Sequence, residues 1–234
     1  DQVSVIRSPI ADDTYRRIYW SGDTRVGGSV LYSYTPAVSS GGGTEYPNNY
    51  YKLGIPAPTV KPTTTLVSGV VVGVSTEARA YVYTYVGKMG EESAPSPPSD
   101  ILICPSGSST VNVSALTVDV SAGTSREIVS LRIYRTAVGS SGNAEYLFVD
   151  EIDVAYVMPY VDTKLTDTLA ESLPSTDWTP PRDSMLNLGL TAHGVAYGSL
   201  GKILCLSEPF IPYAWPRGYE LTSDTDVVAI GHYD

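Results

Sequence analysis

The stretch from Ala80 to Val86 constrains the fold more than any other part of the chain, because tyrosine alternates there with the β-branched residues valine and threonine. Tyr81, Tyr83 and Tyr85 fall on one face of an extended strand, since side chains in a strand alternate with period two. β-Branched and aromatic residues at this density favour a pleated sheet over a helix. The sequence therefore predicts a strand that carries three tyrosines on one face.

Turn-forming and strand-breaking residues follow this strand directly. Gly87 and Gly90 supply the backbone freedom that a turn requires. The prolines between residues 95 and 98 have no backbone N–H, so they end regular ladder bonding. A second apolar run, Ile101–Cys104, comes next. Together these features predict a hairpin-like unit from a β-sandwich.

The composition indicates an all-β protein. The 234 residues include 21 Gly, 17 Pro and 18 Tyr but only 2 Phe, which is typical of a turn-rich chain with amphipathic aromatic residues. No long window shows the apolar repeat of about 3.6 residues that an amphipathic helix requires. A chain of this length can bury a substantial core. We expect a fibronectin- or immunoglobulin-like β-sandwich, flanked by strands of a larger, propeller-like β-rich body.

Proline- and glycine-rich stretches divide the chain into three regions. Residues 1–54 should contribute strands to a larger β body, residues 55–176 should form the sandwich, and residues 177–234 should begin a second, propeller-like β region. Further strands are predicted over residues 16–20, 29–34, 110–114, 116–120, 128–135, 146–152, 160–163 and 227–230, with two short strands around Gly198–Gly201, one helical turn within 165–172 and a Gly-rich loop tip at 39–44.

The charge and the chain ends narrow the function classes. A net charge of −10 argues against binding the backbone of a nucleic acid, which requires clustered Lys and Arg. DNA could still pass close by, because repulsion prevents it from adhering. No apolar run reaches about 18 residues, so no membrane span is predicted. The chain starts without an initiator Met or a signal peptide, and we expect both ends to be cuts through a longer polypeptide.

No motif indicates catalysis. The Gly-x-Ser-x-Gly elbow of a hydrolase does not occur, and His193 and His232 lack the ligand spacing of a zinc site. Residues 198–202 lack the spacing and the following helix of a phosphate loop, so we interpret them as a hairpin turn. We therefore expect no enzyme activity, no metal ion and no cofactor.

The acidic residues and the cysteines have mainly structural interpretations. Solvated turn acids are favoured for the carboxylate groups, although a catalytic pair would not be visible as a spacing in the sequence. These groups are Asp12/Asp13, Glu91/Glu92, Asp150/Glu151/Asp153, Asp162/Asp167 and Asp224/Asp226. Cys104 and Cys205 lie in apolar runs and are predicted to be buried thiols, with a disulfide between them left open.

The tyrosine face allows three interpretations. Tyr81, Tyr83 and Tyr85 could stack on a carbohydrate, pack against the opposite sheet, or contact a neighbouring subunit, where tyrosine is enriched. Packing, against the opposite sheet or against a neighbouring subunit, is favoured over carbohydrate stacking. We keep these residues as candidate interface residues.

Two resemblances add to these observations. Residues 81–96, with Tyr-x-Tyr-x-Tyr followed by Gly-Glu-Glu-Ser-x-Pro-Ser, resemble the strand-and-turn signature of fibronectin type III modules. The wider pattern resembles bacteriophage tail proteins of the nozzle, or tail tubular, type. It is carried by residues 8–13 and 17–20, Tyr51–Pro58, Leu131–Thr136 and residues 207–216.

The second resemblance implies a structural role without catalysis. The protein would be a virion component, assembled in the host cytoplasm, that forms a homo-oligomeric ring, expected to be a hexamer. The ring would surround the DNA-ejection conduit and dock on adaptor or portal proteins, while DNA passes through without specific binding. Phe210, Tyr213 and Trp215 lie in a proline-punctuated loop and are predicted to anchor a subunit contact. The alternative is a receptor- or glycan-binding module that uses the tyrosine face or the loop at 39–44.

Overall fold

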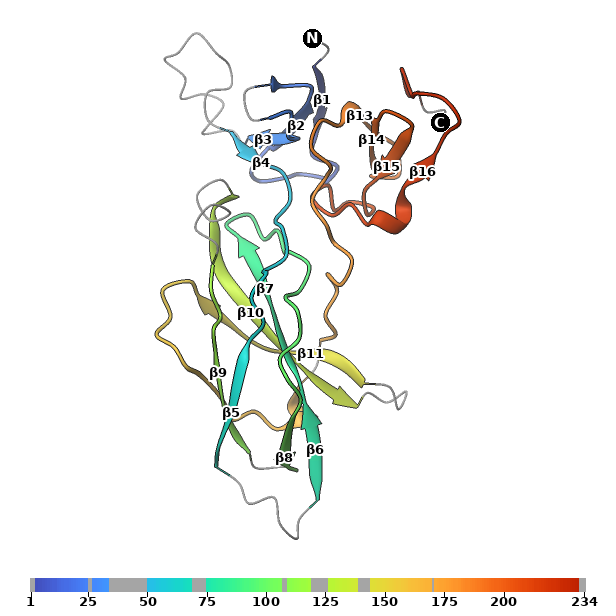
Figure 1. Ribbon diagram of the computed structural model, residues 1–234. Helices are drawn as coiled ribbons and strands as arrows, with labels where there is room; N and C mark the ends of the chain where they lie inside the picture. The colour runs from blue at the N-terminus through green and yellow to red at the C-terminus, as the bar shows by residue number, and fades with distance from the viewer. Residues whose placement is uncertain are drawn as a thin grey trace. The chain divides into compact units, whose positions relative to one another are not determined.

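The computed structural model shows an all-β chain. The structure describes residues 3–24, 27–33, 50–68, 75–106, 109–118, 126–138, 144–169 and 171–231. Apart from strands, named elements among these residues are two short 3₁₀ turns, η2 (Thr166–Thr168) and η3 (Arg217–Tyr219) (Figure 1). None of the described helices is long and apolar enough to span a membrane.

The chain folds as two compact units. Unit 1 comprises residues 1–56, 125–127 and 177–234, and unit 2 comprises residues 57–124 and 128–176. Unit 2 is therefore an insertion, in sequence, between the two main segments of unit 1. The boundaries expected from the sequence place residues 1–54 and 177–234 in separate regions, whereas the described parts of both belong to unit 1.

Unit 1 contains two four-stranded antiparallel sheets, and in both the strands are paired in chain order. The first sheet consists of β1 (Ser4–Arg7), β2 (Ile18–Ser21), β3 (Leu31–Ser33) and β4 (Tyr51–Lys52), and the second of β13 (Leu186–Leu190), β14 (Ala196–Leu200), β15 (Ile203–Leu206) and β16 (Leu221–Thr222). Both contribute to a single core, which includes Tyr19, Tyr32, Met185, Cys205 and Trp215. Neither sheet buries its apolar face alone.

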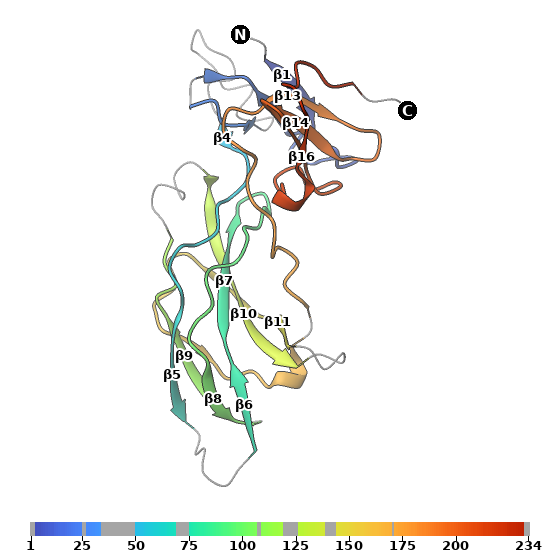
Figure 2. The ribbon, with the colours of Figure 1, turned by 45° about the vertical axis from the view of Figure 1, so that its right-hand side comes forward.

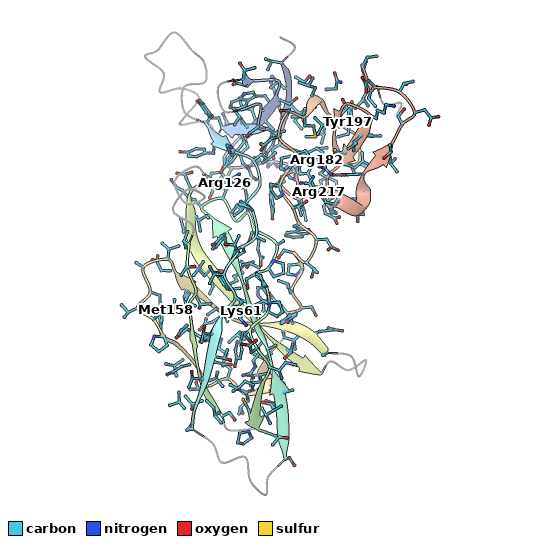
Figure 3. All side chains as sticks on the ribbon, viewed as in Figure 1. Lys61, Arg126, Met158, Arg182, Tyr197 and Arg217 are labelled. Atoms are coloured by element: carbon cyan, nitrogen blue, oxygen red, sulfur yellow. The ribbon has the colours of Figure 1, made fainter. Side chains whose placement is uncertain are left out.

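Two glycines in the second sheet are required by close packing. A Cβ atom at Gly198 would lie 2.7 Å from Sδ of Met185, and one at Gly189 would lie 2.2 Å from the ring of Tyr197. Gly198 and the two residues after it belong to β14, so the hairpin turn predicted over residues 198–202 is shorter than expected and lies at residues 201–202. Ion pairs of Arg182 and Arg217 with Glu220 also lie in this unit (Figure 3).

Unit 2 contains two three-stranded sheets and a two-stranded ribbon (Figures 1 and 2). In pairing order, one sheet is β11-β10-β7, the other is β12-β9-β5, and the ribbon is β6-β8. The strands are β5 (Thr63–Ser68), β6 (Thr76–Arg79), β7 (Tyr81–Gly87), β8 (Leu102–Pro105), β9 (Thr110–Ser114), β10 (Ile128–Val138), β11 (Ala144–Asp153) and β12 (Tyr160–Asp162).

Strand β7 is buried along its whole length, and both of its edges are paired. On one edge it pairs antiparallel with β10. On the other edge it meets the segment 93–99, whose serines alternate with prolines and so cannot form a regular ladder. The backbone N–H groups of Ser93, Ser96 and Ser99 donate to the carbonyls of residues 85, 83 and 81 at 3.0, 2.9 and 2.8 Å.

The side chains of the same serines take the place of the backbone carbonyls that would accept the N–H groups of β7 in a regular ladder. Their Oγ atoms accept the N–H groups of residues 85, 83 and 81 at 2.9, 3.2 and 2.9 Å, respectively. Each Oγ then donates to the backbone carbonyl of the following residue. A segment without regular strand geometry therefore satisfies every backbone group of the three tyrosines on this edge, as burial requires.

Three details of the predicted strands are wrong. The run Ile101–Cys104 does form a strand, β8, but its partner is β6, because the serine segment already occupies the edge of β7. Described residues 116–118 are not a strand, and the chain turns just before them at Ala115, whose φ is +59°. Residues 227–230 are also outside any strand, and Val228 is 84% exposed.

We expect Ser96→Ala to lower the free energy of unfolding by about 1–3 kcal/mol, because it leaves the buried N–H of Tyr83 without its acceptor. Urea denaturation of the purified chain measures this loss as a shift in midpoint. The matched control is Ser172→Ala, which removes an exposed hydroxyl and should change stability by less than about 0.5 kcal/mol. Equal losses in the two variants would contradict the role of the serine hydroxyls.

Candidate functional site

The predicted tyrosine face is part of the core of unit 2. Tyr81, Tyr83 and Tyr85 are 0%, 0% and 2% exposed. The hydroxyl of Tyr81 donates to Oδ2 of Asp162 at 2.8 Å, and those of Tyr83 and Tyr85 donate to the carbonyl of Thr117 at 3.2 and 2.8 Å. Glycan stacking and subunit contact are therefore wrong for these three residues, because their rings and hydroxyls are used inside the unit. The packing interpretation agrees with these contacts.

The aromatic loop of unit 1 separates into buried and exposed members. Trp215 is 1% exposed, and its Nε1 donates to the carbonyl of Pro212 at 2.8 Å, so the prediction that it lies in a subunit interface is wrong. Tyr213 is half-buried and packs edge-on against Trp178. Phe210 is 53% exposed and has a φ of +60°, which a non-glycine residue adopts at an energetic cost. Phe210 remains the exposed candidate for a contact.

The buried carboxylates of unit 2 are the main feature that the sequence did not reveal. Asp162, Glu91 and Glu92 are 0%, 1% and 3% exposed, so the solvated-turn interpretation is wrong for them. It does describe Asp224 and Asp226, which are exposed in a bend after β16. Buried charges require partners, and in unit 2 these come from strands distant in sequence.

Asp162, at the end of β12, is the centre of one buried charged cluster. Its Oδ2 accepts from Nη1 of Arg135 at 2.6 Å as well as from Tyr81, and its Oδ1 accepts the N–H of Lys164 at 2.9 Å. Arg135 is 0% exposed and also donates through Nη2 to the carbonyl of Lys164 and to Oγ1 of Thr166. The pair joins β10 to β12 across the two sheets.

Arg79 and Glu77 extend this cluster along β6. Nε of Arg79 donates to Oε1 of Glu77 at 2.7 Å, and Thr166 donates to Oε2 of Glu77 at 2.9 Å. Nη1 of Arg79 lies 4.0 Å from Oδ2 of Asp162. Two cations and two anions therefore neutralise one another, which suits a structural cluster better than a proton-transfer site.

A second cluster is centred on Glu92. Its carboxylate accepts from Oγ1 of Thr84 at 2.8 Å, from the hydroxyl of Tyr134 at 2.7 Å and from Nη1 of Arg132 at 2.8 Å. Arg132 in turn pairs with Glu151 at 2.9 Å. Burial and the nearby Glu92 carboxylate raise the pKa of Tyr134 well above its usual value. Glu92 thus joins β7 and β10 through side chains as well as backbone.

A pocket of about 660 Å³ lies beside the Asp162 cluster, within unit 2. One wall consists of residues 76–80, and the other includes Thr136, Ala137, Ala144 and Tyr146. Its volume falls in the range of small ligand sites. Of the three titratable side chains that line it, Glu77 and Arg79 are already paired with each other, and burial raises the pKa of the third, Tyr146. This pocket is the candidate binding site of the structure.

Other predicted sites can be placed as follows. His193 is exposed in the turn between β13 and β14, whereas His232 and the loop at 39–44 lie outside the described residues. Cys104 and Cys205 are both buried free thiols, as predicted, and burial raises the pKa of each. Within the described ranges, no group of three or more His, Cys, Asp or Glu side chains is arranged to hold a metal ion.

Two comparisons with known proteins bear on the identity of the chain. No protein-family model matches the chain, and no curated protein matches it at a significant level.

We expect Asp162→Ala to lower the free energy of unfolding by about 3–5 kcal/mol, because it leaves the buried guanidinium of Arg135 without its counter-charge. Asp100→Ala is the control, since it removes an exposed ion pair with Lys61 that is worth about 0–1 kcal/mol. Chemical denaturation of both variants measures the difference. A loss below about 1 kcal/mol in Asp162→Ala would show that the buried pair does not stabilise the unit.

Alkaline pH should destabilise the chain through Tyr81. Burial, and next the Asp162 carboxylate, raise the pKa of Tyr81 above the ordinary value of about 10. Above that pH the unfolded state loses the proton while the folded state keeps it, so stability is complete below about 10 and falls as the pH rises. We expect Tyr81→Phe to make this decline shallower by up to about 1.4 kcal/mol per pH unit, measured by urea denaturation from neutral to alkaline pH. An unchanged slope would contradict the assignment.

Proposed function

We propose that this chain is a structural component of a bacteriophage tail, of the nozzle or tail tubular type, that acts through protein–protein contacts without catalysis. It would be part of the virion, assembled in the host cytoplasm as a homo-oligomeric ring, expected to be hexameric, on adaptor or portal proteins. The ring would surround part of the DNA-ejection conduit. The resemblance of the sequence and the architecture of the chain both support this proposal.

The observation that carries the proposal is the insertion of unit 2 into unit 1. The resemblance implies a β-rich, partly propeller-like body that contains an inserted fibronectin-like sandwich. In unit 1, two four-stranded antiparallel sheets with strands in chain order share one core, and we interpret them as propeller-like blades. In unit 2, tyrosines of β7 bond to residues in or next to strands of the other sheet, and we interpret the unit as the sandwich.

The use of the charged residues also supports a structural role. The buried acids of unit 2 hold arginines and hydroxyls of neighbouring strands, as Asp162 holds Arg135 and Glu92 holds Arg132. Such pairs fix strand positions. The net charge of −10 supports passage of DNA without capture, because an acidic lumen repels the phosphate backbone.

The test of the proposal is the assembly state of the intact protein, measured by native mass spectrometry and electron microscopy. We expect rings, and we expect Phe210→Gly to shift the ring–protomer equilibrium at least tenfold toward protomers, since exposed aromatic residues are frequent hot spots. Glycine suits the φ of +60° at this position, so the free energy of unfolding should change by less than about 1 kcal/mol.

The control for this test is Leu221→Ala, because Leu221 is equally apolar and is 58% exposed in the same unit. We expect it to assemble as the unchanged protein does. A protein that stays monomeric at all concentrations and binds a ligand on a glycan array would contradict the proposal and support the receptor-binding alternative. If Phe210→Gly leaves the ring–protomer equilibrium unchanged, Phe210 is not part of the subunit contact, but the proposal that the protein forms a ring still stands.

A further inference from the structure

We propose that the free edge of β6, at the pocket of unit 2, binds an extended polypeptide segment that adds to the edge as a strand. This inference does not depend on the proposed function. It rests on the backbone groups of β6 and β10, on the pocket between them, and on the charges around the pocket.

The first observation is that, in the described part of the chain, β6 pairs with a strand along one edge only. Its partner on that edge is β8, with Glu77 opposite Cys104. On the other edge, the N–H and carbonyl of Ala80 bond to Thr136. Because backbone groups alternate with period two, those of Thr76 and Ala78 point to the same side as those of Ala80. Among the described residues, the N–H of Ala78 and both backbone groups of Thr76 have no hydrogen-bond partner on that side.

The second observation is that β10 leaves this edge at Thr136. The bond from the N–H of Thr136 to the carbonyl of Ala80 is the last backbone bond between the two strands. The hydroxyl of Thr136 also donates to the carbonyl of Ala78 at 3.4 Å, and beyond Thr136 the described residues 137 and 138 pair with β11, through Glu145 and Ala144. Figure 1 shows β6 and β8 continuing past the end of β7 while β10 and β11 run on together in a different direction. The edges of β6 and β10 therefore move apart from the bond between Ala80 and Thr136 onward.

The third observation is that the pocket of about 660 Å³ fills this divergence. Five consecutive residues, 76–80, line one wall. A run of consecutive residues places side chains from both faces of the strand around the pocket, including those of Glu77 and Arg79, and so brings the backbone edge between them to the pocket as well. The space is thus bounded by unpaired N–H and C=O groups, which are the groups that a further strand would satisfy.

Small or apolar side chains line much of the pocket, beside those of Glu77, Arg79 and Tyr146. Ala78 and Ala80 lie on the β6 side, Ala137 and Ala144 lie on the β10–β11 side, and Ile101 is 72% exposed at the margin. Small residues leave room for the backbone of an added strand to approach the edge. Apolar residues favour alternate apolar side chains on the segment that binds.

The charges indicate which segment fits. Glu145 is exposed between two residues that line the pocket, whereas Asp100, between Ser99 and Ile101, is already paired with Lys61 at 2.8 Å. The guanidinium of Arg79 is turned into the buried cluster and pairs with Glu77, so it does not offset Glu145 at the surface. Charge complementarity therefore favours a basic segment, and the net charge of −10 disfavours a second copy of this chain. We infer an extended segment with alternating apolar and Lys or Arg side chains.

The probe is a peptide of about seven residues that alternates lysine and valine, matched in length to a typical strand. We expect it to bind the purified chain with a Kd below about 1 mM by fluorescence anisotropy. A second peptide of the same sequence carries N-methyl groups on alternate residues and so lacks the N–H groups that pair with the edge. We expect the second peptide to bind at least tenfold more weakly. Amide hydrogen exchange at Ala78 should slow when the first peptide is added.

Ala144→Trp tests the location, because the indole would fill the pocket from an exposed position on β11. We expect it to weaken binding at least tenfold. Ala155→Trp, at an exposed alanine just after β11, is the matched control and should bind as the unchanged chain does. Absence of binding, equal binding of the two peptides, or equal binding by the two tryptophan variants would each overturn the proposal. Equal binding of the peptides would show adhesion by charge alone.

Discussion

The pairing of β7 with a proline-containing segment through serine hydroxyls is the interaction on which unit 2 depends. Proline removes backbone donors, yet β7 is buried along its length and every backbone group on its edge must find a partner. Ser93, Ser96 and Ser99 supply a donor from the backbone and an acceptor from the side chain. The same exchange joins Ser207 to Ala196 in unit 1. Both units thus use a serine that donates its backbone N–H and accepts through its hydroxyl to pair with the edge of a strand.

This pairing determines how the rest of unit 2 uses its polar groups. With both edges of β7 occupied, Tyr81 faces the second sheet and reaches Asp162, which also holds Arg135. The buried charges are then committed to internal contacts. Among the described residues, the surfaces that we propose for partners are the edge of β6, where the pairing ends, and the exposed ring of Phe210 in unit 1. A protein that acts through contacts, rather than through a reacting centre, is consistent with this distribution.

Local patterns predicted the parts of the fold that depend on neighbours in sequence. The alternation around Tyr83 identified β7, and the all-β class followed from composition and turns. The serine pairing was missed because serines spaced by three residues do not resemble a strand. The shared core of unit 1 was missed because it joins distant segments: Ser29 donates to Asp183, 154 residues away. The turn-acid interpretation fails for Asp162, whose partner Arg135 lies in the run Leu131–Arg135, where an arginine among apolar strand residues indicates a buried counter-charge.

Amide hydrogen exchange along β7, followed by NMR, tests the central claim most directly. The N–H groups of Tyr81, Tyr83 and Tyr85 bond to serine hydroxyls, whereas antiparallel geometry directs those of Val82 and Thr84 toward carbonyls of β10. If the serine side is a true part of the sheet, both sets exchange at the same slow rate, through unfolding of the whole unit. Faster exchange of the three tyrosine amides than of their neighbours would show that the serine edge opens independently and would contradict the account.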